Sequence, residues 1–307
     1  MSTTAPSSAR PHQVRGGILS MLIFTAVFTV MVAAGKSSVA NYSFVQVVFI
    51  RCAVALVVVG VITAFSRGGL AQLKTRRLAE HVKLGCLMTA NLLVYFLSLK
   101  FLPMNVAVLL SFTSSLFITA LSMPMLGEPV GIHRWGAVVV GFVGVAVITG
   151  SVNGLLQAGT IFAMASAVLS ALCWLTVRQM SNTESSLSVT ISMLITTFVL
   201  TGIALPWFWT TPAWEDVPVL VLVGIAGGLA QILISHAYRL APSVIIAPFN
   251  YFQLIWSAII AFILWSEIPT VRMLAGGALI VAAGLYILFR ETRKPKPAAT
   301  VLQGEAG

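Results

Sequence analysis

The chain contains ten long apolar stretches, and they constrain its fold more than any other feature of the sequence. About twenty residues in a helix, at ~1.5 Å each, cross the ~30 Å hydrocarbon core of a bilayer. Because backbone groups must find partners within hydrocarbon, such stretches are expected to span as helices. We place them at residues 17–35, 44–65, 82–99, 104–126, 135–150, 157–177, 187–208, 217–238, 244–265 and 272–289.

The composition agrees with a chain that lies almost entirely in a membrane. Hydrophobic residues make up 58% of the 307 positions and charged residues only 8%, far from the usage of soluble domains. The net charge of +10 comes mainly from bases in tails and connectors, as orientation signals do, so we expect no nucleic-acid partner. Cys52, Cys86 and Cys173 all fall in apolar stretches, which argues against a disulfide framework.

Two stretches share one frame and indicate an internal duplication. Residues 100–103 (KFLP) precede the stretch that ends at Glu128, and residues 239–242 (RLAP) precede the one that ends at Glu267. Base, proline and acid therefore recur at an offset of 139 residues. The offset covers five spans, an odd number, so the two halves must cross the membrane in opposite directions. Inverted repeats with a site between them near the midplane are a recurrent architecture of secondary transporters.

The chain resembles the drug/metabolite transporter superfamily, EamA type. The resemblance rests on VVFIRCAVAL at residues 47–56, LKFLPMNVAVLLSF in the first half and YRLAPSVIIAPFNYFQ in the second. It implies an all-α membrane protein with ten transmembrane helices, arranged as two inverted five-helix repeats around a central cavity for small organic metabolites. One departure is that Thr113-Ser114-Ser115 stands where the family often has a proline within span four, which puts a broken fourth helix in doubt.

The chain divides accordingly into two tails and two repeats. Residues 1–16 form a cytoplasmic N-terminal tail that continues into an uncleaved first helix, since no convincing cleavage site follows it. Residues 17–150 are the first repeat, 151–289 the second, and 290–307 a cytoplasmic C-terminal tail. Lys and Arg concentrate in the tails and the inner connectors. The outer segments hold only Lys36, Lys100 and Arg272.

Polar side chains recur at helical spacing on spans one, three, four, six, eight and nine, which predicts a polar-lined cavity between them. Ser and Thr in such helices commonly bond the preceding turn, so packing is the alternative for them. Amides at this depth need partners, so for them we weigh the two interpretations evenly. The candidate cavity residues on these spans are Asn91, Tyr95, Ser111, Ser115, Ser170, Trp174, Gln231, Asn250, Tyr251 and Gln253.

Arg51 is the one formal charge deep within a span. In a structural role, its side chain snorkels to the outer face or binds backbone carbonyls at a helix end. In a functional role, it anchors a carboxylate, phosphate or other electron-rich group in the cavity. Lys36, at the outer end of span one, is either a second charge for that purpose or an interfacial residue. His236, near the inner end of span eight, is either a helix-end hydrogen bonder or a proton relay.

These features favour a secondary transporter of a small organic metabolite over other classes of membrane protein. The sequence offers no catalytic set, no His pair at metal spacing and no filter-like element, so we expect no enzyme activity and no cofactor. A cavity without carboxylates suits a neutral, zwitterionic or anionic solute, such as an amino-acid-like, organic-acid or flavin-like molecule. A broad-specificity efflux pump is the alternative, and a non-transporting enzyme or receptor a distant one. The expected partners are the substrate, the bilayer of the cell (inner) membrane and a second copy through small-residue helix faces.

The charge bias predicts that both tails are cytoplasmic. Reporter fusions at Arg293 should behave as inside, and fusions in the 210–216 connector, which carries Glu215 and Asp216, as outside. A C-terminus that reports from outside would remove the argument for inverted halves.

Overall fold

A computed structural model describes residues 11–64, 77–127, 130–150, 152–180 and 184–292. Within these residues every regular element is a helix, and ten spans are long and apolar enough to cross a membrane, as expected. The elements are α1 (Pro11–Asn41), α2 (Phe44–Ala64), α3 (Leu78–Phe101), α4 (Met104–Ser111), α5 (Ser114–Leu126), α6 (Ile132–Thr149), α7 (Val152–Leu155), α8 (Ala158–Met180), α9 (Ser186–Ala204), η2 (Leu205–Trp207), α10 (Val217–Leu240), α11 (Ser243–Ile246), η3 (Ala247–Tyr251), α12 (Phe252–Trp265) and α13 (Val271–Thr292).

The fourth span is broken into α4 and α5 although it lacks a proline at the break. Phe112 and Thr113 make tight i→i+3 bonds, from Phe112 N to Leu109 O (3.2 Å) and from Thr113 N to Leu110 O (3.0 Å). The Thr113 hydroxyl also donates to Leu110 O at 2.6 Å. A threonine that bonds back onto its own helix therefore accompanies the break, which the absence of proline had put in doubt.

The ninth span is broken at the equivalent place. It runs through α11 and the 3-10 helix η3, which contains Pro248, and then continues as α12. With the offset of 139 residues, 104–111 correspond to 243–250 and 114–126 to 253–265. The two interruptions thus coincide, one in each repeat. Glu128, the first-repeat counterpart of Glu267, lies outside the described residues.

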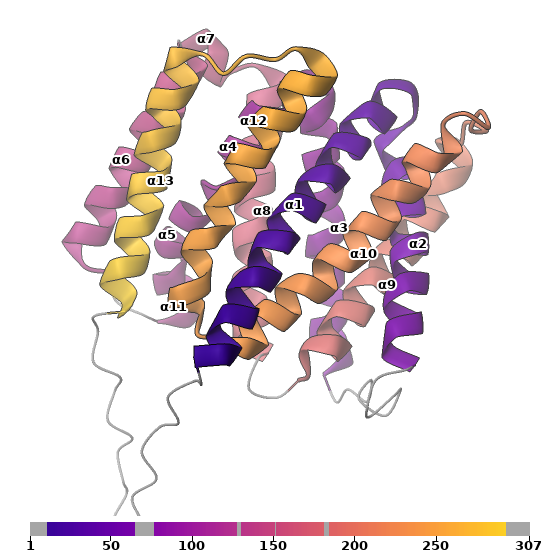
Figure 1. Ribbon diagram of the computed structural model, residues 1–307, viewed down its shortest axis with the longest axis horizontal. Coiled ribbons are helices and arrows are strands. Elements are labelled where there is room, and N and C mark those ends of the chain that lie inside the picture. The colour runs from indigo at the N-terminus through magenta and orange to yellow at the C-terminus, as the bar shows by residue number, and fades with distance from the viewer. Residues whose placement is uncertain (1–10, 65–76, 128–129, 151, 181–183, 293–307) are drawn as a thin grey trace, which may run out of the picture.

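Contacts between the helices follow the same two-fold pattern. α1 packs on α10 as α8 packs on α3, α2 packs on α10 as α9 packs on α3, and α1 meets α12 as α8 meets α5. The helices α6 and α13 pair at one side of the molecule, on the left in Figure 1, and α2 and α9 pair at the other. The N-terminus of α1 and the C-terminus of α13 lie on the same side of the molecule (Figure 1). Each half is therefore built against its inverted counterpart.

Glycines let the paired helices approach closely. A Cβ on Gly144 of α6 would lie 2.6 Å from the carbonyl oxygen of Gly276 on α13. Gly224 and Gly228 of α10 face α2, where a Cβ on Gly228 would lie 3.1 Å from the Val58 side chain. Small residues spaced in this way allow backbones to touch across a membrane-embedded interface.

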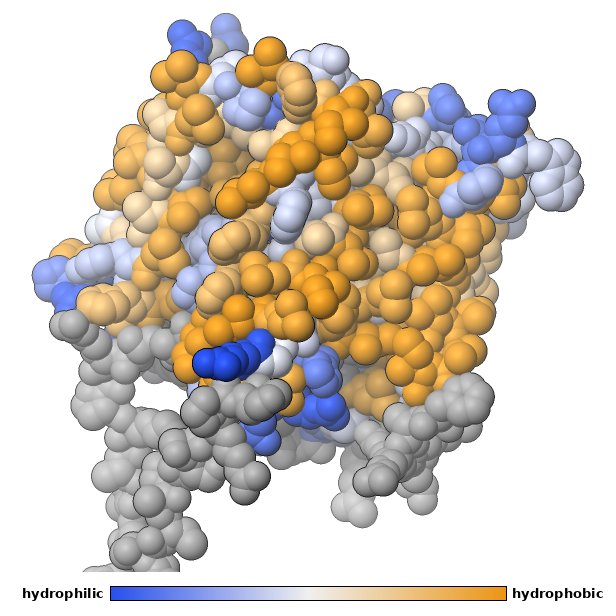
Figure 2. Space-filling model, in the orientation of Figure 1, coloured by the Kyte–Doolittle hydropathy of each residue, from blue (hydrophilic) through white to orange (hydrophobic). Residues whose placement is uncertain are grey.

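The outside of the bundle is apolar across its middle. Figure 2 shows apolar side chains over the central part of one face, with polar ones gathered towards the two ends. Exposed aliphatic side chains include Leu222 of α10 (41% exposed) and Ile263 of α12 (70%). Large exposed aliphatic side chains of this kind would be a liability in water and are the expected contact surface in lipid.

The α6–α13 contact should tolerate no side chain at its centre. Gly276→Ala would place a Cβ against the Gly144 backbone, so the apparent melting temperature in detergent should fall, by an amount equivalent to about 1–3 kcal/mol. Gly136→Ala on α6 is the matched control, because its Cβ meets nothing within 4 Å and alanine is the better helix former. Equal melting temperatures for the two variants would contradict the close contact.

Candidate functional site

The two helix breaks meet at the middle of the molecule. Phe112 stands at the break between α4 and α5, and Tyr251 at the end of η3. Their rings stack, with centroids 4.9 Å apart and planes inclined by 25°. The two residues are related by the repeat offset of 139, so this stack joins equivalent points of the two halves.

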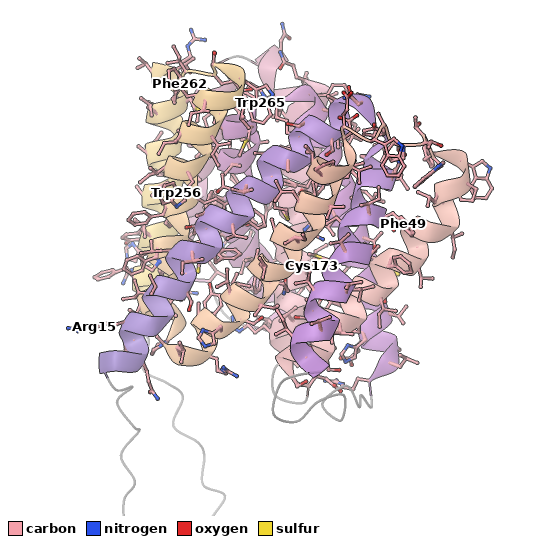
Figure 3. The ribbon with its side chains drawn as sticks, turned by 45° about the vertical axis from the view of Figure 1, so that its right-hand side comes forward. Arg15, Phe49, Cys173, Trp256, Phe262 and Trp265 are labelled. Atoms are coloured by element: carbon pink, nitrogen blue, oxygen red, sulfur yellow. The ribbon has the colours of Figure 1, made fainter. Side chains whose placement is uncertain are left out.

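Three polar atoms on α3, η3 and α12 are buried without a partner in the part of the chain that the structure describes. They are the Tyr95 hydroxyl, the Asn250 side-chain oxygen and the Trp256 indole nitrogen. Gln253, one turn after Asn250, is only 4% exposed. Figure 3 shows Trp256 about midway down the molecule and Trp265 at its upper end. Leaving a buried polar atom unpaired costs about 1–3 kcal/mol, so these atoms are candidates for bonding a ligand.

Other predicted cavity residues already bond within the protein. The Asn91 side-chain oxygen accepts a bond from Ser166 (2.8 Å), which joins α3 to α8, and Gln231 donates weakly to Thr190 (3.4 Å) between α10 and α9. Ser111 donates to Val108 O. Each of these groups therefore has a hydrogen-bond partner within the protein.

The remaining members of the predicted set occupy different surroundings. Ser115 donates to Phe112 O at 2.9 Å, again within its own span. Ser170 on α8 is half-buried, and Trp174, one turn further, is 48% exposed. Tyr95 and Gln253 are therefore buried, Asn250 is half-buried with a buried side-chain oxygen, and Trp174 lies closer to the surface.

Arg51 lies in a narrow pocket between α2, α3, α9 and α10. It is 6% exposed, and its nearest acceptors in the described residues are sulfurs, with Met31 Sδ 3.4 Å from Nε and Cys52 Sγ 3.8 Å from Nη1. No carboxylate among those residues pairs with it. Gly227 gives it room, since a Cβ there would lie 3.1 Å from Nε. The pocket is lined by Arg51, Met88, Leu92, Thr190, Met193, Leu194, Thr197, Gly227 and Gln231.

Lys36 forms an ion pair that ties three elements together at the end of the bundle opposite the N-terminus of α1 (Figure 1). Its Nζ lies 2.7 Å from Glu267 Oε1 and donates to Leu102 O at 3.2 Å. The second oxygen of Glu267 accepts the first backbone N–H of α4, that of Met104, at 3.1 Å. The ammonium also stands 4.9 Å from the centre of the Trp265 ring. Glu267 thus caps a helix of the other repeat, where a negative charge is favoured.

The described end of the molecule opposite Lys36 has polar ties of its own. His236 Nδ1 lies 3.0 Å from the Ser20 hydroxyl, which joins α10 to α1. His81 of α3 contacts Glu184 and Ser192, although sequence reasoning selected none of the three. His81 lies far from the other two residues in the chain. The one feature of the sequence that points to them is that an acid and a histidine lie next to apolar stretches.

A matching tie joins connectors at the Lys36 end. Tyr42 donates to Asp216 (2.6 Å) and accepts from the Ala213 N–H (3.1 Å). The hydrogen bond to Asp216 raises the pKa of Tyr42, because the neutral phenol is the form that donates. Gln46 bonds both backbone groups of Thr210 nearby (2.7 and 2.9 Å). The α9–α10 connector is therefore held against the start of α2.

Comparison with known proteins gives a family for this arrangement. A model described as the EamA-like transporter family matches residues 15–150 and 157–290, one match in each half. A solved structure titled "Crystal structure of protein" superposes with a TM-score of 0.65 and 19% identity, covering 93% of this chain and 100% of that one. That likeness shows the fold.

Curated relatives are named as transporters of small metabolites. The S-adenosylmethionine uptake transporter of Rickettsia bellii (strain RML369-C) is 27% identical over 221 residues, covering 72% of this chain and 76% of the relative. The riboflavin transporter of Vibrio cholerae serotype O1 is 28% identical over 303 residues (93% and 97%). The pseudopaline exporter CntI of Pseudomonas aeruginosa (strain UCBPP-PA14) is 25% identical over 280 residues (88% and 94%).

The Lys36–Glu267 pair should be energetically coupled. Both side chains are mostly buried (14% and 19% exposed), so Lys36→Met and Glu267→Gln should each cost about 1–3 kcal/mol of stability by leaving a partner unpaired. The double variant should lose less than the sum, which a double-mutant cycle of thermal unfolding in detergent measures. Additive losses would contradict the pair.

Proposed function

The chain belongs to the EamA-like transporter family, and we propose that it carries a small organic metabolite with a carboxylate or another anionic group by alternating access. Two family matches, one in each half of the chain, and relatives named for metabolite transport support the general activity. The relatives are named for both uptake and export, so they favour neither direction here. The preference for an anionic or zwitterionic solute comes from the charge of the site.

The observation that carries this proposal is a buried arginine without a buried acid. Among the described residues the Arg51 guanidinium, in a side chain only 6% exposed, has sulfur atoms as its hydrogen-bond acceptors, and moving an isolated charge into low dielectric is costly. A carboxylate or phosphate would supply both the missing charge and strong acceptors for the guanidinium fork. Thr190, Thr197 and Gln231 make the wall of the same pocket partly polar, although each also has a partner within the protein.

The groups around the helix breaks suit the organic part of such a solute. Tyr95, Asn250 and Trp256 offer a hydroxyl, an amide oxygen and an indole N–H that are buried without partners in the described chain. The stacked Phe112 and Tyr251 rings at the helix breaks offer an aromatic surface. Ring-containing and amino-acid-like metabolites combine these features, and neutral solutes could use the same polar atoms without Arg51.

Alternating access is supported by the symmetry of the breaks. Each repeat carries one interrupted helix, and residues at a break can change backbone angles without disturbing a continuous hydrogen-bonded ladder. The outer ends are joined by the ion pair of Lys36 with Glu267 and by the bond from Tyr42 to Asp216. Opening towards the outside would require these ties to separate while the other end closes.

Orientation and assembly complete the proposal. Both tails are cytoplasmic and the bilayer is that of the cell (inner) membrane, as the charge bias predicts. The substrate leaves chemically unchanged, without an enzymatic step. We also propose a homodimer through small-residue helix faces. Such a dimer would need other small residues than Gly144, Gly276, Gly224 and Gly228, because these already pack within the chain.

Arg51 is the most direct residue to test. Arg51→Lys should retain part of the transport, whereas Arg51→Gln should lose at least about tenfold, since charged hydrogen bonds are worth about 1.5–3 kcal/mol. Transport is measured in proteoliposomes at matched protein levels, together with thermal stabilisation by the substrate. Arg272→Gln, which replaces an exposed basic residue in the first turn of α13, is the control, and this variant should show normal transport. Unchanged affinity in a folded Arg51→Gln protein would retire the anionic preference.

The amides of span nine form a second test. Asn250→Leu and Gln253→Leu should lower transport while expression and membrane insertion stay near normal, because leucine suits an apolar phase and the lost amide would have bonded the solute. Gln157→Leu, at an exposed position before α8, is the control. Wild-type kinetics in both span-nine variants would place these amides in the packing class.

A further inference from the structure

The contact between His81 and Glu184 is an ionisable pair that the transport site does not use. The side chains are 1% and 4% exposed, and His81 Nε2 lies 3.3 Å from Glu184 Oε2, without the angle of a strong hydrogen bond. His81 stands near the start of α3 in the first repeat, and Glu184 in the connector before α9 in the second. The carboxylate of the second repeat therefore faces the imidazole ring of the first across a buried contact.

Ser192 completes the arrangement on the other side of the ring. Its hydroxyl lies 2.5 Å from His81 Nδ1 and 3.0 Å from its own-helix carbonyl, Val189 O. With the imidazole charged, Nδ1–H donates to Ser192, whose proton goes to Val189 O. With the imidazole neutral, the Ser192 hydroxyl turns and donates to Nδ1, and Nε2–H still faces Glu184. The hydroxyl therefore satisfies Nδ1 in both protonation states.

We propose that His81, Glu184 and Ser192 form a proton-binding site that makes transport respond to pH at the end of the molecule where α3 begins. The proton is taken up and released at His81 Nδ1, and Glu184 stabilises the charged form. Release leaves a neutral ring that keeps its hydrogen bonds, so the site can cycle without unfolding its surroundings.

The equivalent tie at the other end lacks this property. There Tyr42 bonds Asp216, and the raised pKa of the phenol keeps it neutral across the physiological range. The Tyr42–Asp216 tie joins the start of the second span to the start of the eighth. The His81–Glu184 tie joins the start of the seventh span to the start of the third. Only the His81–Glu184 tie contains an imidazole, the side chain that can take up and release a proton there, so the two ends of an otherwise symmetric molecule differ in their chemistry.

Other ionisable groups lie on α3 and on the helices packed against it. The described part of α9 carries none between Ser186 and Ala204. On α3 itself, Arg77 lies 2.8 Å from Glu80 in an exposed pair. The remaining ionisable groups on elements packed against α3 are Lys83, Cys86, Tyr95 and Lys100 of α3, Arg51 and Cys52 of α2, Arg178 and Cys173 of α8, and Arg15 and Lys36 of α1.

The site is connected to the Arg51 pocket by one continuous interface between α3 and α9. One turn above His81, Gly85 lies against Thr196, and one turn further Thr89 bonds Thr197 at 3.0 Å. Thr197 lines the Arg51 pocket. A proton at His81 adds positive charge to this interface and so favours an anion beside Arg51. This consequence rests on the proposed function, whereas the proton site itself does not.

The proton site is tested by following the histidine resonances of the full-length protein in lipid nanodiscs between pH 5 and pH 9. His81 should titrate within this range, and Glu184→Gln should move its midpoint down by about 1–3 pH units, because the stabilising charge is lost. His133, exposed at the start of α6, is the internal control and should not move. A His81 that keeps one protonation state throughout, or a midpoint unchanged in Glu184→Gln, would overturn the proposal.

Transport supplies the second readout and separates the two proposals. Riboflavin, S-adenosylmethionine and an amino-acid panel are offered to proteoliposomes with the lumen and bath at equal pH, from pH 5 to pH 9. His81→Gln should flatten a pH profile that the wild-type protein shows by at least threefold, and Glu184→Gln should shift it to lower pH. A profile unchanged in His81→Gln would refute the pH response. Titration of His81 without transport of any compound would leave the proton site standing and count against the transport proposal alone.

Discussion

The requirement that buried polar groups find partners in hydrocarbon governs this structure. Backbone groups satisfy it by forming helices, and many serines and threonines satisfy it by bonding a carbonyl three or four residues back, as Ser111 and Thr113 do. Against that background the exceptions stand out. Arg51 has sulfur neighbours where a carboxylate would be expected, and Tyr95 and Asn250 keep unpaired oxygens among the described residues. A bound solute that supplies the missing hydrogen-bond partners would offset the cost of burying these groups.

The inverted duplication determines how the helices meet that requirement by packing together. Equivalent helices pack on each other's counterparts, the two interrupted spans meet through Phe112 and Tyr251, and Glu267 of one repeat caps α4 of the other. The contacts that hold the molecule together are thus largely contacts between repeats. A movement of one repeat against the other would change both ends at once, and the titratable tie at His81 would make the two ends unequal.

The sequence predicts the spans and the repeat because both depend on patterns along the chain. Apolar length identifies helices, and the spacing of base, proline and acid identifies the duplication. The break at Phe112 was not predicted, since it depends on turn bonds and a threonine hydroxyl instead of proline. The Lys36–Glu267 pair joins residues 231 positions apart, and no local pattern announces it. Which polar side chains stay unpaired depends on packing between helices, so it too could not be predicted.

Transport by the purified protein is the measurement that tests the account most directly. The wild-type protein in liposomes is offered a panel of neutral, zwitterionic, anionic and cationic metabolites, and both the lumen and the medium are analysed for the intact compounds. The account predicts that at least one zwitterionic or anionic metabolite crosses the membrane unchanged, with cationic ones moving more slowly. A metabolite chemically converted without crossing, or transport confined to cations, would contradict it.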